Sequence, residues 1–268
     1  MAEAVRQTLV TPQANTPALW PKLESRHFDF LTGDVVKYEA NLEAIELLRT
    51  LESSGRAPDE TERERLNRFT GWGGLPQAFN ENQNDPHWVA RALRLKRLLN
   101  EEEYRSAKES TLNAHFTRLD VIETMWAMVQ KMGFEGGRVL EPAAGIGYFL
   151  GAMPQTLARN SQITAVELDE MSARILRVLY ERDNVRVIHE AFEKAPLPER
   201  FYDLIIGNVP FGNYSVPCPR NRRYSNFSIH NYFFAHGLEL LRPGGIMVLI
   251  TSSYLLDALS NKVRAYLS

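Results

Sequence analysis

The spacing of hydrophobic positions changes near residue 111 of this chain. Before that point, apolar residues recur at three- and four-residue intervals, which is typical of amphipathic helices. The helix that begins near Asn41 carries this spacing in Leu42, Ile45, Leu47, Leu48 and Leu51. Residues 1–16 have no such periodicity and are predicted to be a mobile tail. Residues 17–110 are predicted to form a helical N-terminal region.

From residue 111 onward, short apolar runs alternate with helical segments. The predicted strands are Arg138–Glu141, Gln162–Glu167, Val185–His189, Asp203–Gly207 and Gly245–Thr251. The predicted helices are Leu119–Met132, with Thr117 as its N-cap, and Phe149–Leu157, Met171–Tyr180 and Asn231–Leu241. Strands separated by helices of this length form a parallel, doubly wound sheet, so residues 111–268 are predicted to be an α/β domain.

The fourth strand ends in a group of residues suited to binding an aromatic amine. In open α/β sheets, ligands bind beyond the carboxyl ends of the strands. Asn208 supplies a side-chain carbonyl there, and Pro210 fixes the direction of the Val209 carbonyl. Phe211 adds a flat apolar face for a planar ring. An ordinary Asn-Xaa-Pro turn after a strand is the alternative.

The first strand leads into a glycine-containing loop that opens a helix. Gly145 and Gly147 let the backbone approach a ligand, but a dinucleotide fingerprint needs a third glycine where this chain has Leu150. Glu141, at the strand's end, would oppose a pyrophosphate and attract an ammonium group. Glu167 ends the second strand, where an acid can bind both hydroxyls of a ribose. Together these residues suit S-adenosylmethionine, although each alone is also an ordinary strand-end acid or turn glycine.

Composition limits the class of protein. The 268 residues are 44% hydrophobic and 24% charged, as in a globular protein, and Cys218 is the single cysteine. The sequence has no apolar run long enough to cross a bilayer and no signal-peptide pattern, so we expect a cytoplasmic protein without a membrane partner. The net charge of −2 is unusual for a dedicated DNA-binding module. If the chain acts on DNA, the positive charge that attracts the phosphates must come from local patches or from a partner.

Three further segments have two interpretations each. The loop Phe69–Pro76, which contains Trp72, either borders the cofactor site or is a packing loop anchored by the tryptophan. Residues 86–110 form a basic helical stretch that is either solvated or faces DNA. A loop after the turn at residues 208–211 carries three arginines that either contact DNA phosphates or are simply solvated, namely Arg220, Arg222 and Arg223.

The ordered motifs resemble those of amino-group DNA methyltransferases. They are Ala114-His115-Phe116-Thr117, Glu141-Pro142-Ala143-Ala144-Gly145-Ile146-Gly147, Glu167-Leu168-Asp169 and Asn208-Val209-Pro210-Phe211. Their order is that of the adenine-N6 enzymes. The Phe-Thr-Gly-Trp-Gly-Gly-Leu stretch and the Asn-Val-Pro-Phe-Gly variant look most like the methylase module of large phage and plasmid methylase–helicase fusion proteins. The resemblance covers the chain from about residue 40 to its end.

The resemblance implies a fold and an activity. The fold would be that of a Rossmann-like class I methyltransferase. The activity would be site-specific, adenine-specific DNA methylation, in which a methyl group passes from S-adenosylmethionine to the N6 amino group of a flipped-out adenine. No metal is implied.

The resemblance also implies roles for individual residues. Phe116 and Thr117 would cover the methionine end of the cofactor, Glu141 would bind its ammonium group and Glu167 its ribose. Pro142, Ala143, Gly145 and Gly147 would form the loop around the cofactor, and Leu168 follows the ribose acid. Phe192 would pack on the cofactor's adenine. The acid that usually precedes this aromatic is Ala191 here, unless Glu190 substitutes. Asn208, Val209, Pro210 and Phe211 would be the catalytic residues.

Two other functions are compatible with these motifs. Protein-glutamine methyltransferases hold a carboxamide with a similar motif, and a non-catalytic S-adenosylmethionine-binding subunit of a defence or anti-restriction assembly would need only the cofactor half. The chain also lacks a recognisable closing hairpin and a target-recognition domain. We therefore expect a helicase or target-recognition region, in a longer polypeptide or a separate specificity subunit, to join it on double-stranded DNA.

Overall fold

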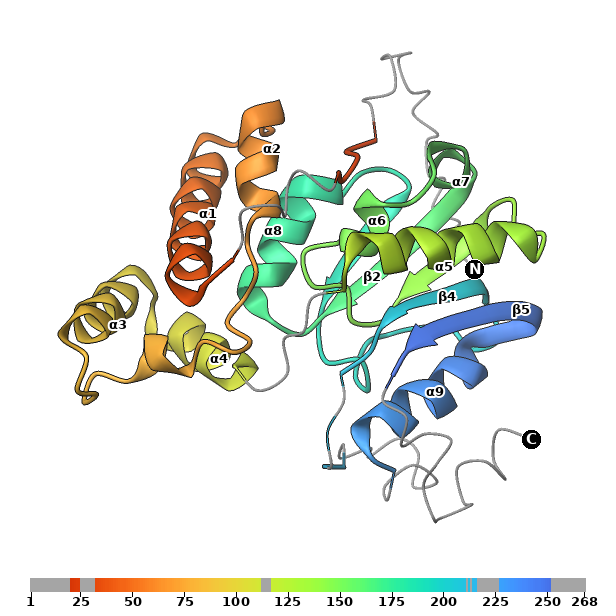
Figure 1. Ribbon diagram of the computed structural model, residues 1–268. Helices are drawn as coiled ribbons and strands as arrows, with labels where there is room; N and C mark the ends of the chain where they lie inside the picture. The colour runs from red at the N-terminus through yellow and green to blue at the C-terminus, as the bar shows by residue number, and fades with distance from the viewer. Residues whose placement is uncertain are drawn as a thin grey trace, which may run out of the picture.

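A parallel β-sheet forms the centre of the protein. The computed structural model describes residues 20–24, 32–111, 117–210, 212, 214–215 and 227–251, so the predicted tail lies outside the described residues. Five strands pair in parallel in the order β3-β2-β1-β4-β5 (Figure 1). They are β1 (Gly137–Glu141), β2 (Ser161–Glu167), β3 (Val185–His189), β4 (Tyr202–Asn208) and β5 (Leu241–Ile250). The predicted α/β class is confirmed.

Helices cover both faces of this sheet. In the described part of the chain, the helices are α1 (Asp34–Ser54), α2 (Glu60–Asn67), the 3₁₀ helix η2 (Pro76–Phe79), α3 (Pro86–Leu98), α4 (Glu101–Ser110), α5 (Leu119–Lys131), α6 (Tyr148–Gly151), α7 (Gln155–Arg159), α8 (Glu170–Tyr180) and α9 (Ile229–Leu240). Side chains alternate along each strand. Leu204 and Ile206 pack with α5 to α8 on one face, whereas Ile205 packs with α9 on the other. Figure 1 shows α5 and α9 on opposite sides of the sheet. No helix in the described part of the chain is long and apolar enough to cross a membrane.

The N-terminal helices pack on the sheet's own helices. One continuous apolar cluster runs from α1 and α2 through α8 to the strands. A charged network reinforces the contact, because Arg174 of α8 binds Glu52 of α1 and Glu103 of α4, and Arg49 also binds Glu103 at 2.8 Å. The division near residue 110 remains a prediction.

Several element boundaries differ from those predicted. Helix α1 begins at Asp34, seven positions before Asn41, and α9 begins at Ile229, two positions before Asn231. The helix expected over Phe149–Leu157 is split into α6 and α7, because Pro154 lacks an N–H and disfavours helical geometry in the residue before it. The stretch 86–110 is divided where Asn100 and Glu103 form a capping box that starts α4. The last strand begins at Leu241, four positions before Gly245, and its pairing with β4 is irregular there.

The N-cap of α5 was also predicted wrongly. Arg118 occupies the N-cap position without a side-chain cap bond. Thr117 makes a different contact, which belongs to the site described below.

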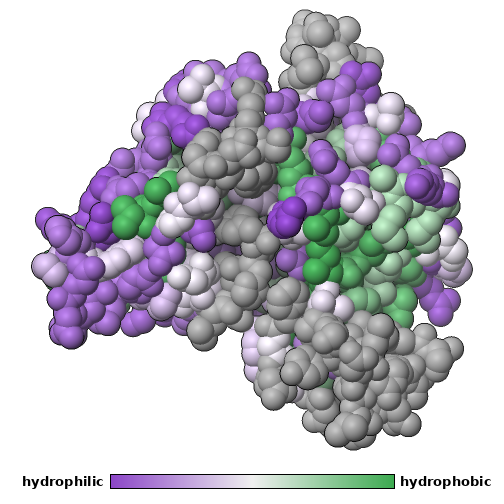
Figure 2. Space-filling view, viewed as in Figure 1, coloured by the Kyte–Doolittle hydropathy of each residue, from purple (hydrophilic) through white to green (hydrophobic). Residues whose placement is uncertain are grey.

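Two cations on the basic face of α3 are paired with carboxylates. Arg94 Nη1 lies 2.9 Å from Glu39 Oε2, and Lys96 Nζ lies 2.6 Å from Glu81 Oε1. Hydrophilic residues dominate this part of the surface (Figure 2). Because these cations already have anionic partners, the solvated interpretation of this helix is favoured.

Gly147 offers a test of the packing between the glycine loop and α8. Its φ of +92° is matched by +90° at Gly133, so alanine costs similar backbone strain at both positions. A Cβ at Gly147 would lie 2.6 Å from Leu176 Cδ1, whereas nothing lies within 4 Å of one at Gly133. We expect Gly147→Ala to lower the free energy of unfolding by about 1–3 kcal/mol more than Gly133→Ala, as measured by denaturant titration. Equal losses would show that α8 does not restrict this loop.

Candidate active site

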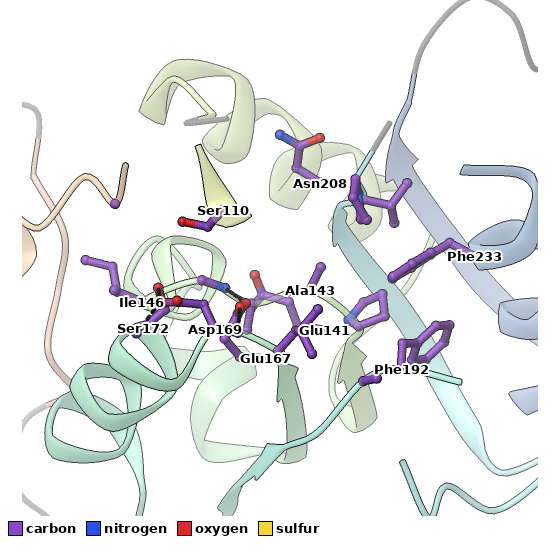
Figure 3. A pocket seen from close by; sticks show the side chains of 18 of the residues that line it. Ser110, Glu141, Ala143, Ile146, Glu167, Asp169, Ser172, Phe192, Asn208 and Phe233 are labelled. Atoms are coloured by element: carbon purple, nitrogen blue, oxygen red, sulfur yellow. Dashed lines mark hydrogen bonds between the residues drawn. The ribbon is translucent and has the colours of Figure 1, made fainter. Parts of the chain in front are cut away.

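A cavity of about 600 Å³ lies at the carboxyl ends of β1, β2 and β4. This is the edge at which ligands bind in open α/β sheets, and the volume suits a cofactor-sized molecule. Figure 3 shows Asn208 and Ser110 across the cavity from Glu141 and Glu167. Most of the described residues that the motifs predicted line this cavity, namely Thr117, Glu141, Pro142, Ala143, Gly145, Glu167, Leu168, Phe192, Asn208, Val209 and Pro210.

Glu141 is a buried acid, and one of its oxygens is unpartnered in the described part of the chain. Its side chain ends β1, the residue is 1% exposed, and Oε2 has no hydrogen-bond partner among the described residues. Burial, and then the charge of Glu167, raises the pKa of Glu141 well above its ordinary value. Such a carboxyl group is suited to a cationic ligand, because a cation would favour its ionised form.

Glu167 is held by the backbone of two loops. Its Oε2 accepts the N–H of Gly145 at 2.6 Å, and its Oε1 accepts the N–H of Asp169 at 2.8 Å. Gly145 has a φ of +54°, which glycine tolerates better than other residues. Burial and the nearby Asp169 raise the pKa of Glu167 to about 7, although the backbone hydrogen bonds act in the opposite direction.

Gly147 does not line the cavity. It was expected to face the cofactor together with Gly145, but a Cβ added at this position would collide with Leu176 and Tyr180 of α8. Its N–H donates to the Ala144 carbonyl at 2.8 Å, which closes the turn into α6. The two glycines therefore have different roles in the loop. Gly145 forms the turn whose N–H binds Glu167, and Gly147 lets α8 pack closely against the loop.

Asn208 presents an unused acceptor. Its Nδ2 donates to Thr117 Oγ1 at 3.0 Å, whereas its buried Oδ1 has no partner in the described part of the chain. The hydrogen bond to Thr117 fixes the orientation of the amide. Asn208 therefore lines the cavity and carries a buried carbonyl oxygen whose hydrogen-bonding capacity is unused among the described residues.

The neighbours of Asn208 are held firmly. The N–H of Val209 donates to the Ile250 carbonyl at 3.2 Å, which ties the turn to β5. Pro210 follows it in the cavity lining. Phe192 lies farther along the wall and stacks on Phe233 of α9, with ring centroids 4.7 Å apart. Glu190 also lines the cavity, and its Oε1 accepts the N–H of Ala191 at 2.9 Å.

Several lining residues come from outside the motifs. The loop residues Phe69, Thr70 and Gly71 border the cavity, as do Ser106, Glu109 and Ser110 of α4. Ser106 Oγ donates to Asp169 Oδ1 at 3.1 Å, and Asp169 also caps the start of α8. The Phe69–Pro76 loop was a sequence candidate. The contribution of α4 depends on its tertiary placement and has no local signal in the sequence.

Five candidate residues lie outside the described residues, namely Phe116, Phe211, Arg220, Arg222 and Arg223. Within the described ranges, no group of three or more His, Cys, Asp or Glu side chains is arranged to hold a metal ion.

Comparisons with known proteins identify a family and several relatives. A family model described as "Eco57I restriction-modification methylase" matches residues 99–268. The chain is 27% identical over 232 residues to the "Defense against restriction protein B" of Escherichia phage P1, covering 85% of this chain and 8% of that protein. It is 30% identical over 122 residues to the tRNA1(Val) (adenine(37)-N6)-methyltransferase of Serratia proteamaculans, covering 42% of this chain and 47% of that enzyme. The chain thus spans less than half the length of each of these two relatives.

Solved structures with low sequence identity also match. The type I restriction-modification methyltransferase subunit of Streptococcus thermophilus is 14% identical, with 90% of this chain and 64% of that chain covered and a TM-score of 0.48. An S-adenosylmethionine-dependent O-methyltransferase of Thermotoga maritima is 14% identical, with 57% and 49% covered and a TM-score of 0.39.

The raised pKa of Glu167 leads to a prediction about stability. The folded chain binds this proton more tightly than the unfolded chain, because the pKa rises from 4.5 to about 7. The resulting stabilisation is complete below the unfolded pKa and is lost as the pH rises through about 7. In thermal melts without ligand between about pH 5.5 and 8, wild type should lose stability relative to Glu167→Gln as the pH rises. A constant difference across this range would contradict the raised pKa.

Proposed function

Because this chain belongs to the Eco57I restriction-modification methylase family, we propose that it transfers a methyl group from S-adenosylmethionine to the N6 amino group of adenine in DNA. The observation that carries the proposal is the Asn208 side chain, whose Oδ1 is buried at the cavity and has no partner among the described residues. A carbonyl oxygen held in this way accepts a hydrogen bond from an amino group.

The cavity residues fit the cofactor. Glu141 is a buried acid with an unpartnered oxygen, which suits an ammonium group, and Glu167 ends β2, where a ribose acid is expected. Phe192 lies in the lining and provides an apolar surface for a purine ring. We propose that Thr117 and the glycine loop complete the enclosure, together with Phe116. When bound, S-adenosylmethionine supplies an electrophilic methyl group on a sulfonium.

The substrate half of the site activates a weak nucleophile. The lone pair of an adenine amino group is delocalised into the ring. Asn208 Oδ1 and the Val209 carbonyl each accept one amino hydrogen, which localises the lone pair on nitrogen for in-line attack. Positioning and electrostatics then account for most of the rate enhancement. The adenine leaves the duplex to reach this pocket, and stacking on Phe211 offsets part of the unstacking cost.

Two comparisons support the choice of substrate. The names of the Serratia proteamaculans and Pedobacter heparinus relatives specify adenine N6 in tRNA, which supports adenine over a protein glutamine. The description of the matching family, restriction-modification methylase, supports DNA. RNA adenine methylation is the second candidate, because of the tRNA enzymes.

The surroundings of the site are also part of the proposal. We propose that Arg220, Arg222 and Arg223 contact DNA phosphates. Because the chain spans only 8% of the phage P1 relative, we propose that recognition of the DNA sequence involves a helicase or target-recognition region, or a separate specificity subunit.

The substrate proposal is tested in a bacterial host without adenine methylation of its own. DNA and RNA from cells that produce the chain, together with any longer polypeptide to which it belongs, are digested to nucleosides and quantified. We expect N6-methyldeoxyadenosine in DNA, and much less of it in cells that produce the matched Asn208→Ala protein. N6-methyladenosine in excess in RNA alone would establish the RNA alternative, and methylation of neither would overturn the proposal.

The contact between Thr117 and Asn208 leads to a second prediction. Asn208→Ala should lower the methylation rate by about 10²–10³-fold while the affinity for the cofactor changes little. Thr117→Val removes the hydroxyl that orients the amide and should lower the rate by about tenfold, the effect of losing roughly 1.4 kcal/mol in the transition state. Thr117→Ser keeps the hydroxyl and serves as the control. Single-turnover rates that are equal for the Val and Ser variants would show that this hydrogen bond does not orient Asn208.

A further inference from the structure

The loop Phe69–Gly71 forms a wall of the cavity although it lies far from the methylase motifs in sequence. We propose that Asn41 of α1 is a positioning residue for cofactor binding, because it holds the backbone of this loop against the cavity. The inference rests on the proposed function, since it takes the cavity to be the cofactor site.

Asn41 contacts the loop through both ends of its amide. The N–H of Thr70 donates to Asn41 Oδ1 at 2.7 Å, and Thr70 Oγ1 donates to the same oxygen at 3.2 Å. Asn41 Nδ2 donates to the Gly71 carbonyl. The side chain thus bonds two consecutive loop residues, and both line the cavity.

The burial of Asn41 indicates that these bonds matter. The residue is 0% exposed in a helix whose neighbouring buried positions, including Leu42 and Ile45, are apolar. Burying an amide in such surroundings is unfavourable unless its donors and acceptors are satisfied. Here the loop backbone satisfies them. No apolar side chain of similar size can act as donor and acceptor at once.

Other contacts hold the segments on either side of these two residues. Tyr148 Oη, from the helix after the glycine loop, donates to the Asn67 carbonyl at 2.9 Å. Trp72 packs edge-on against Phe79, with ring centroids 5.3 Å apart, and also contacts Tyr38 of α1. Between these anchors, the amide of Asn41 determines the position of the Thr70–Gly71 peptide.

The first experiment measures the dissociation constant of S-adenosylmethionine by calorimetry for wild type and Asn41→Leu. Leu51→Ala is the control, because it destabilises α1 ten residues from Asn41, about 15 Å along the helix. We expect Asn41→Leu to weaken binding by about tenfold, or about 1.4 kcal/mol, and Leu51→Ala to lower only the melting temperature. Affinity within about twofold of wild type for Asn41→Leu would overturn the inference. A wild type that does not bind would instead refute the proposed cofactor site.

A second variant distinguishes positioning from simple stability. The carboxyl group introduced by Asn41→Asp accepts from Thr70 but repels the Gly71 carbonyl when ionised. When protonated, it donates to that carbonyl as the amide does. The ratio of the Asn41→Asp to the wild-type dissociation constant should therefore fall as the pH is lowered from about 8 to about 6, since burial raises the pKa of a carboxyl group. A ratio independent of pH would contradict the role of the Gly71 bond.

Hydrogen exchange in the wild-type protein decides the question if Asn41→Leu does not fold. Saturating S-adenosylmethionine should slow amide exchange in peptides covering residues 69–75 as well as in those covering residues 141–147. Protection of the glycine loop alone would show that the Thr70–Gly71 wall is not part of the cofactor site.

Discussion

The parallel pairing of β1 with strands on both sides is the constraint on which the site depends. Val139 is paired with Ile163 of β2 and with Leu204 of β4, so the three strands run in one direction and end at one edge. Glu141, Glu167 and Asn208 are the last residues of these strands. In the sheet order, the chain runs from β1 to β2 and β3 on one side and then to β4 and β5 on the other. The cavity lies at this switch point, where the connections that follow neighbouring strands go to opposite sides.

The pKa values of acidic side chains are shifted in opposite directions at the two edges of the sheet. At the amino edge, Asp203 accepts hydrogen bonds from Arg138 of β1 and Arg242 of β5, and the bonding from Arg138 holds the pKa of Asp203 well below its ordinary value. At the carboxyl edge, burial raises the pKa of Glu141 and of Glu167, and neither has a cationic partner among the described residues. The ion pairs of Asp203 stabilise the sheet without a ligand. Glu141 and Glu167, in contrast, would gain a cationic partner only from a ligand.

The strands and the strand-end acids were predictable, because short apolar runs and the residues that follow them are local features of the sequence. Four predicted strands differ from the observed bounds by at most one residue at each end. The orientation of Asn208 was not predictable, because it depends on a hydrogen bond to Thr117, 91 positions away. The role of Asn41 was not predictable for the same reason. Its helix was identified from its leucines, and the hydrogen bonds of the Asn41 amide to the Thr70–Gly71 loop depend on tertiary structure. The capping box at Asn100 and the break at Pro154 were local signals that we overlooked.

The segment before α1 is bonded to the helix that follows the glycine loop. Trp20 Nε1 donates to the Leu150 carbonyl at 2.8 Å, and the N–H of Leu23 donates to the Gly151 carbonyl at 2.9 Å. Both acceptors belong to α6, the helix that opens directly after the glycine loop. A chimera joined at the start of the α/β sequence would therefore expose these carbonyls together with the apolar surface beneath them. A junction upstream of Trp20 keeps both hydrogen bonds, so the N-terminal segment and the glycine loop are best exchanged between proteins as one unit.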